Sequence, residues 1–364
     1  MNNDISTQLN TRSMRPFQWM VIGICMVLNA LDGFDVLVMA FTASAVSAEW
    51  SLNGANLGAL LSAGLVGMSI GSFFIAPWAD RIGRRPLVLI CLILAGIGMV
   101  MAAYCQTPMQ LGVCRGITGL GIGGILASTN VMASEFASTK WRTLAVSLQS
   151  TGYALGAVFG GMLAIYLLKV FGWRSVFLAG GVATLAMVPV VYCFLPESID
   201  FLLAKRPANT LQRINRVGRK LGLNQLVDLP PMQSAEVARV NAFAALLSPR
   251  YRSATLKLWT LFFFVLFGFY FVMGWTPKLL TTAGLSAEQG ITGGVLLSAG
   301  GIFGTALLGL LCTKFKLAHV QAVFLIATAA LMVVFVQSTS NLSLAFLIGL
   351  LLGVTVNGSV AGLF

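Results

Sequence analysis

Residues 17–41 read FQWMVIGICMVLNALDGFDVLVMAF, an apolar run long enough to cross a bilayer as one helix. Two acidic side chains, Asp32 and Asp35, interrupt this run. An ionised carboxylate inside hydrocarbon is costly, and it is retained mainly for function. At this spacing both carboxylates leave the same face of a helix, where they can share one cavity, one cation or one proton. The run therefore predicts a membrane protein that moves a solute across the bilayer.

Composition supports the same prediction. Hydrophobic residues make up 57% of the chain and charged residues only 9%, whereas soluble domains contain about 25% charged residues. The formal net charge is +12, but the basic residues fall in short segments between apolar runs and form no face with aromatic residues that could bind bases. We therefore expect the lipid bilayer, and no nucleic acid, as the surroundings of this chain.

Cysteine and histidine usage argues against a metal site and against an enzyme. All six cysteines lie within apolar runs, without a CxxC pair, and His319 is the sole histidine. This pattern indicates neither a disulfide framework nor a zinc site. A membrane enzyme would need a nucleophile, base or metal constellation that the sequence does not offer. We expect no catalytic residues, no metal and no cofactor.

Ten apolar runs have the length of a membrane-spanning helix. They are 17–43, 55–79, 87–106, 109–134, 143–168, 173–195, 256–276, 290–312, 319–336 and 341–364. With a cytoplasmic N-terminus, nearly all Lys and Arg residues of the connecting segments fall inside, and only Lys169, Arg174 and Lys278 fall outside. This asymmetry predicts a multi-pass protein of the cytoplasmic (inner) membrane.

One long polar stretch divides the chain. We expect a six-helix bundle over 1–195, a cytoplasmic basic linker over 196–255, and a second bundle of four spans over 256–364. The basic run 211–223 is compatible with an amphipathic helix on anionic headgroups and equally with a solvated linker.

A short repeat links the two bundles. The string LLSAG occurs at 60–64 in span two and again at 296–300 in span eight. Such a match in equivalent elements is typical of a duplicated transporter. Because the first bundle has six spans, we expect the second bundle, with four, to be incomplete.

Residues 76–85 read APWADRIGRR and connect spans two and three. This loop resembles the signature loop of the major facilitator superfamily, with Ala76 in place of the leading glycine. The resemblance implies an all-α, two-bundle transporter in which the loop aspartate and arginines form a charge relay that closes the cytoplasmic side. The gating candidates are Asp80, Arg81, Gly83, Arg84 and Arg85, with Glu135 and Arg142 at the inner end of span four. The alternatives are a basic inside loop without a gating role and a solvated segment around Glu135.

Residues 115–124 read RGITGLGIGG, which is similar to the span-four motif of the same superfamily. Counting about 1.5 Å per residue from the outer ends, Arg115 lies roughly 10 Å deep and the two aspartates roughly 12 to 16 Å deep. The three side chains can therefore meet in one layer. The alternative is that Arg115 extends its long stem to the outer interface.

The string DGFD at 32–35, taken with these motifs, resembles the aromatic acid:proton symporter family. The resemblance implies import of benzoate, hydroxybenzoates or related organic acids such as muconate, driven by protons. A carrier of a sugar or a drug is the alternative, as is a truncated and poorly active transporter. We expect a monomer.

The residues suggest how such a symporter would work. A carboxylate substrate in a low-dielectric cavity needs a positive partner, which Arg115 can supply. If Asp32 or Asp35 pairs with Arg115, protonation of one aspartate frees the guanidinium for the substrate. Two aspartates this close titrate as a coupled pair, so neither is assigned as the carrier. Phe34 and Tyr153 are candidates for contact with an aromatic ring, or are ordinary packing residues.

Overall fold

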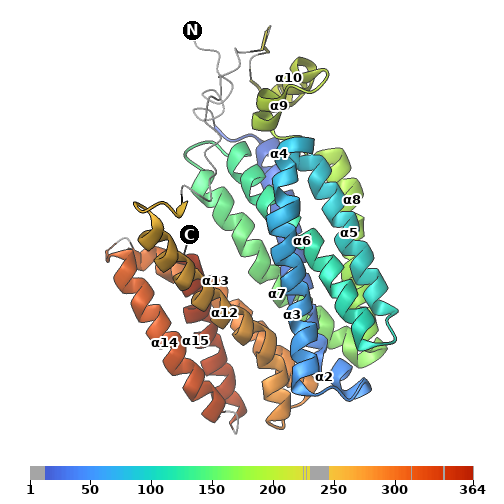
Figure 1. The fold of residues 1–364 in the computed structure, drawn as a ribbon, viewed down its shortest axis with the longest axis vertical. Coiled ribbons are helices and arrows are strands. Elements are labelled where there is room, and N and C mark those ends of the chain that lie inside the picture. The colour runs from blue at the N-terminus through green and yellow to red at the C-terminus, as the bar shows by residue number, and fades with distance from the viewer. Residues whose placement is uncertain are drawn as a thin grey trace. The chain divides into compact units, whose positions relative to one another are not determined.

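The computed structural model describes residues 13–223, 225–226, 228–229, 246–312, 314–338 and 341–363, without the side chains of Thr143 and Val336. The described part is helical and contains no strand (Figure 1). The chain divides into two compact units, Met1–Pro230 and Pro231–Phe364, which are described separately below.

Ten helices of the described residues are long and apolar enough to cross a membrane, which confirms the predicted spans. Those of the first unit are α2 (Pro16–Glu49), α3 (Gly54–Ile70), α5 (Arg84–Ala103), α6 (Pro108–Phe136), α7 (Arg142–Phe171) and α8 (Trp173–Phe194). Those of the second unit are α12 (Arg252–Thr282), α13 (Ala287–Cys312), α14 (Leu317–Gln337) and α15 (Leu342–Ala361). Helix α3 continues through a π-helical turn, η1 (Gly71–Ile75), a 3₁₀ turn, η2 (Ala76–Trp78), and the short helix α4 (Ala79–Ile82).

Local chemistry explains where several helices begin and end. The side chains of Asn53 and Thr107 accept hydrogen bonds from backbone N–H groups in the first turns of α3 and α6, which satisfies donors that have no partner within the helix. One residue, Gly172, separates α7 from α8 and has a φ of +79°. Glycine adopts this backbone conformation without the penalty that a Cβ atom would bring.

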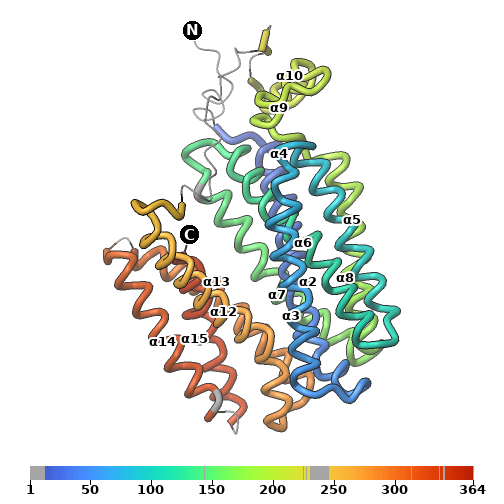
Figure 2. Tube along the Cα trace, in the orientation of Figure 1, coloured from blue at the N-terminus to red at the C-terminus, as the bar shows by residue number. Residues whose placement is uncertain are grey.

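Glycines allow α2 and α7 of the first unit to pack backbone against backbone (Figure 2). A Cβ atom on Gly33 of α2 would overlap the carbonyl oxygen of Tyr153 in α7, and one on Gly156 of α7 would overlap that of Ala30. Small residues at such positions let membrane helices approach closely. The contact holds the DGFD segment of α2 against α7.

The short sequence repeat has a structural counterpart. In the first unit α3 packs on α6, where a Cβ atom on Gly119 would overlap the carbonyl oxygen of Gly64. In the second unit α13 packs on α15, where a Cβ atom on Gly300 would overlap the carbonyl oxygen of Leu350. Gly64 and Gly300 end the two LLSAG strings. Within each unit, therefore, the second span uses its repeated glycine to contact the fourth span.

The predicted linker differs from what the structure shows over its first part. Two helices, α9 (Ile199–Lys205) and α10 (Thr210–Leu221), belong to the first unit, and their apolar side chains join its core. Ile214, Val217 and Leu221 of α10 are buried in that core rather than free to bind lipid. The amphipathic pattern of α10 thus reflects packing on protein. Residues 231–245 of the predicted linker lie outside the described residues.

Candidate functional site

Arg115 of α6 is buried inside the first unit, with 3% of its surface exposed, so it does not extend to the outer interface. Its Nη2 donates a hydrogen bond of 2.7 Å to the backbone carbonyl of Asp35 in α2. Its Nη1 lies 3.6 Å from the sulfur of Met99, and its guanidinium lies 6.0 Å from the ring centroid of Phe177. The structure thus brings α6 and α2 together at Arg115.

Both aspartates of α2 are also buried, with 3% of Asp32 and 1% of Asp35 exposed. They are close enough to interact electrostatically, and the Asp35 carboxyl group also lies near Arg115 and Thr184 of α8. The described residues contain two ion pairs with an N···O distance of 4.0 Å or less, and neither involves these aspartates or Arg115. Arg115 therefore contacts the main chain of Asp35 in this conformation, and its guanidinium is not committed to a carboxylate.

Several polar atoms in this layer have no hydrogen-bond partner. They are Oδ2 of Asp32, Oδ1 of Asp35 and Nε of Arg115, all buried. Buried polar groups normally find partners, and exceptions mark places where water, a proton or a ligand can bind. A cavity of about 10 Å³ adjoins Arg115, which is room for about one water molecule. Its lining residues are Val36, Leu61, Gly64, Leu65, Met68, Arg115 and Ile122.

A neighbouring polar network was missed by the sequence analysis. Asn29 of α2 donates a 2.7 Å hydrogen bond to the carbonyl of Gln149 in α7, and Oδ1 of Asn29 has no partner. The side-chain amide of Gln149 lies 3.4 Å from the hydroxyl of Thr129 in α6. Asn29 stands three residues before Asp32, and this helical spacing is the signal that could have identified it.

The two aromatic candidates occupy different surroundings. The ring of Phe34 is buried, and Cβ atoms on Gly160 of α7 or Gly180 of α8 would overlap it. The ring therefore fills space that these glycines leave, as a packing residue does. Tyr153 is half-buried, and its backbone is the surface on which Gly33 packs.

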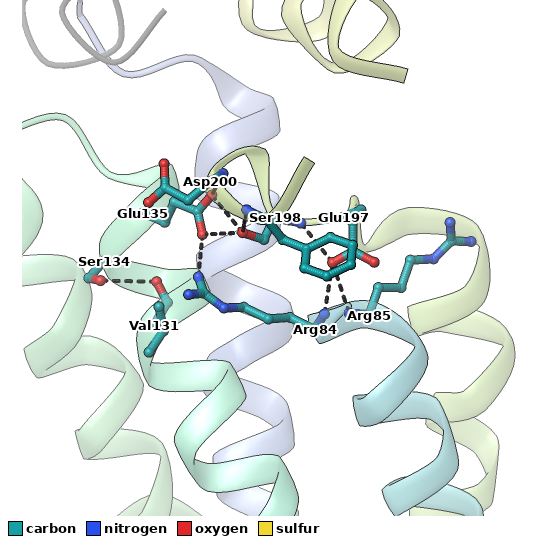
Figure 3. A network of polar contacts seen from close by, with 9 residues as sticks. Arg84, Arg85, Val131, Ser134, Glu135, Glu197, Ser198 and Asp200 are labelled. Carbon is teal, nitrogen blue, oxygen red and sulfur yellow. Dashed lines mark hydrogen bonds and ion pairs between the residues drawn. The ribbon is translucent and has the colours of Figure 1, made fainter. Parts of the chain in front are cut away.

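A second cluster lies at the α4 end of the first unit (Figure 3). Arg84 at the start of α5 and Glu135 near the end of α6 form an ion pair of 2.5 Å, with 16% and 8% of their side chains exposed. Glu135 also accepts hydrogen bonds from the Ser198 hydroxyl, at 2.8 and 2.9 Å, and from the backbone N–H of Asp200, at 2.8 Å. This carboxylate therefore joins α5, α6 and the start of α9.

Glu197 caps α5 from a distant part of the chain (Figure 3). Its Oε1 accepts hydrogen bonds from the backbone N–H groups of Arg84, at 2.9 Å, and Arg85, at 3.2 Å. A carboxylate at a helix N-terminus satisfies free donors and interacts favourably with the helix dipole. Gly83 has a φ of +104°, and a Cβ atom there would overlap the Glu197 carboxylate. The sequence analysis did not place Glu197 or Ser198 at the site, although both follow the proline that ends span six.

The other gating candidates lie differently. Asp80, Arg81 and Arg142 are exposed, whereas Arg84 and Glu135 form the half-buried ion pair. Arg85 donates to the carbonyl of Tyr192 and lies 5.3 Å from the centre of its ring. The structure thus gathers Gly83, Arg84, Arg85 and Glu135 around Glu197 and leaves the remaining three candidates at the surface.

An ion pair that the sequence analysis did not predict lies at the opposite end of the same unit. Arg174 at the start of α8 donates to both oxygens of Glu49, the last residue of α2, at 2.7 and 2.8 Å. Trp173 also donates to Glu49, at 2.7 Å. The pair is about 40% exposed, so it ties two helix ends together at modest energetic gain.

The described residues form ten membrane-length helices in two units. Two acids and an arginine are buried among the spans of the first unit. These features are typical of a multi-pass helical membrane protein of the transporter class. The family model of the major facilitator superfamily matches residues 22–364, and the chain belongs to this superfamily. Its transporter relatives likewise indicate a transporter rather than an enzyme.

The curated relatives include carriers of aromatic acids. The chain is 34% identical over 310 residues to a gallate transporter of Pseudomonas putida, an alignment that covers 84% of this chain and 68% of the relative. It is 29% identical over 361 residues to the 4-hydroxybenzoate transporter PcaK of Pseudomonas aeruginosa, covering 98% and 80%. These relatives agree with the aromatic acid:proton symporter family that the motifs indicate.

Solved structures share the fold. The partially occluded, inward-open xylose transporter XylE of E. coli superposes with a TM-score of 0.74 at 16% identity, covering 95% of this chain and 85% of that one. A bacterial homologue of the human lysosomal transporter Spinster superposes with a TM-score of 0.71 at 20% identity, covering 96% and 75%. Both confirm the all-α transporter architecture.

Proposed function

We propose that this protein imports aromatic carboxylates, of the benzoate and hydroxybenzoate kind, together with protons across the cytoplasmic membrane. The single observation that carries the proposal is the layer formed by Asp32, Asp35 and Arg115 in the first unit, buried and without a carboxylate–guanidinium ion pair. The named relatives supply the substrate class, because they carry gallate and 4-hydroxybenzoate.

Arg115 is suited to bind the substrate carboxylate. A guanidinium can donate two parallel hydrogen bonds to a carboxylate. The Asp35 carbonyl, the Met99 sulfur and the Phe177 ring hold the Arg115 head in place. Its Nε has no partner, so part of the donor fork is available to an incoming anion. A pre-oriented donor costs less conformational entropy on binding than a mobile one.

Coupling to protons follows from charge. With both aspartates ionised, this buried layer would carry an excess negative charge beyond what Arg115 offsets, and a bound substrate anion would add another. A proton taken up by Asp32 or Asp35 offsets the added charge, so anion and proton enter together. In this scheme the substrate carboxylate competes with the aspartate carboxylates for Arg115 until Asp32 or Asp35 is protonated.

The cluster around Glu135 is the proposed cytoplasmic gate. Opposite charges at helix ends can stabilise one arrangement and separate in another. Arg84 and Glu135 would act as the closing pair, with Gly83 and Arg85 positioned by Glu197 and with the exposed Asp80, Arg81 and Arg142 completing the charged rim. The N-terminus would then lie in the cytoplasm.

Transport assays in proteoliposomes test the proposal. Uptake of radiolabelled 4-hydroxybenzoate should rise with an imposed inward proton gradient and fall to background in Asp32→Asn and Asp35→Asn. Arg216→Gln, on the exposed side of α10, is the matched control and should keep normal uptake. Uptake that ignores the proton gradient would refute coupling, and uptake of labelled xylose in place of the aromatic acid would favour a sugar carrier.

A further inference from the structure

Two cysteines at the α5–α6 connection form a sulfur pair that the sequence analysis did not anticipate. The sulfur atoms of Cys105 and Cys114 lie 3.6 Å apart, within hydrogen-bonding distance for thiols. Each cysteine is 5% exposed. Among the described residues this is the one sulfur–sulfur hydrogen bond between cysteines that the structure contains.

The two thiols are placed so that a bond between them requires little movement. Cys105 lies in the short connection between α5 and α6, and Cys114 lies in the second turn of α6. A disulfide needs sulfur atoms about 2.05 Å apart, so the two sulfur atoms must approach by roughly 1.5 Å, and rotation about χ1 moves each sulfur without moving the backbone.

The connection reaches the surface on both sides of Cys105. Tyr104 is 71% exposed, and Gln106 is exposed as well. The backbone carbonyl of Cys105 accepts a 3.1 Å hydrogen bond from Arg174, whose guanidinium also binds Glu49. Arg174 thus ties this connection to the ends of α2 and α8, and Cys105 lies between two exposed residues.

We propose that Cys105 and Cys114 are a redox modification site that exchanges with an external disulfide. One thiolate attacks the incoming disulfide and releases its first thiol, and the second cysteine then displaces the other half, which leaves as a second thiol. The two cysteines lose two hydrogens and the reagent gains them, so the exchange is balanced. In the cell, a periplasmic protein disulfide would be the oxidant, a point that rests on the proposed orientation.

The product would tether the α5–α6 connection to α6 at the residue that precedes Arg115. Closing this ring removes freedom from the outer turns of α6. Oxidation would therefore restrict α6, the helix that carries Arg115, without modifying Arg115 itself.

Thiol exchange on the purified full chain tests the site. The starting protein carries Cys193→Ser and Cys312→Ser, which remove the two cysteines that are not buried. It is treated with 4,4′-dithiodipyridine and digested. The peptide holding both cysteines should be lighter by two hydrogens, free of pyridyl adduct, and restored by dithiothreitol. The buried Cys25 and Cys91 serve as internal controls and should stay reduced.

Single variants distinguish a disulfide between the two cysteines from independent reactions of the two thiols. Cys105→Ser and Cys114→Ser, each in the same background, should yield a pyridyl adduct or no reaction, and never the two-hydrogen loss. A starting protein that carries adducts on both cysteines, or whose peptide stays unmodified while the denatured protein reacts, would overturn the proposal. The main measurement uses the starting protein without either single variant and without substrate, so misfolding of a single variant or failure of the transport proposal leaves its result interpretable.

Discussion

At the scale of single residues, the contacts of the Arg115 side chain bear most directly on anion binding. It is held by a backbone carbonyl, a sulfur atom and an aromatic ring, which are neutral groups. The Asp35 carboxylate lies near Arg115 without forming an ion pair of 4.0 Å or less with it, so the donors of the guanidinium are not occupied by a carboxylate.

Substitution of this residue gives a direct prediction. Arg115→Lys keeps the positive charge but loses the planar donor fork, so we expect binding of the aromatic acid to weaken by about 100-fold or more, equivalent to about 3 kcal/mol. Binding to the purified protein can be measured by scintillation proximity. The control Lys205→Arg, at the end of α9, should bind normally. Normal affinity in Arg115→Lys would exclude a forked contact with the substrate.

Glu197 supports a second prediction, about stability. Glu197→Ala leaves the N–H groups of Arg84 and Arg85 without their carboxylate acceptor, so the free energy of unfolding should fall by about 1 to 2 kcal/mol. A thermal melt in detergent should show a lower midpoint. The neighbouring exposed acid Asp80 provides the control, since Asp80→Ala should leave the midpoint nearly unchanged. Equal melting of the two variants would show that the cap is not stabilising.

At the scale of the elements, glycine positions determine which helices of a unit can touch. Along α2 the glycines are not equivalent: Gly33 meets the α7 backbone, whereas nothing lies within 4 Å of a Cβ atom on Gly23. Substitution of Gly23 therefore tests helix propensity alone, whereas substitution of Gly33 also tests the packing of α2 on α7.

We expect Gly33→Ala to lower the melting midpoint by several degrees, because the added methyl group must push α7 away from α2. Gly23→Ala should be neutral or slightly stabilising, because alanine favours the helix by about 0.5 to 1 kcal/mol over glycine. Thermal unfolding of both variants in the same detergent gives the comparison. A harmless Gly33→Ala would mean that the two helices are less closely packed than described.

At the scale of the whole molecule, the distribution of basic residues predicts which face of the membrane each loop occupies. Cysteines introduced at Ser51, after α2, and at Gln212, on the exposed side of α10, should lie on opposite sides of the membrane. A membrane-impermeant maleimide added to intact cells should label Ser51→Cys, and should label Gln212→Cys only after lysis. The reverse pattern would place the N-terminus outside.

Much of the architecture could be predicted from the sequence because each span satisfies its own backbone hydrogen bonds. A membrane-length apolar run must form a helix in hydrocarbon, so the ten spans needed no knowledge of their neighbours. The first part of the predicted linker could not be placed in the same way. Helix α10 has an amphipathic pattern that suits lipid or protein equally, and its contacts with the first unit come from residues far away in the chain.

For the site, the sequence by itself determined that two acids and an arginine occur within apolar spans, and it predicted a similar depth for them because helical rise converts residue number into depth. Only the tertiary structure decided that Arg115 meets the carbonyl of Asp35, that Glu197 caps α5, and that Cys105 lies beside Cys114. These contacts depend on the rotation and separation of neighbouring helices. Both are set by side chains that pack across the first unit, which no local pattern in the chain records.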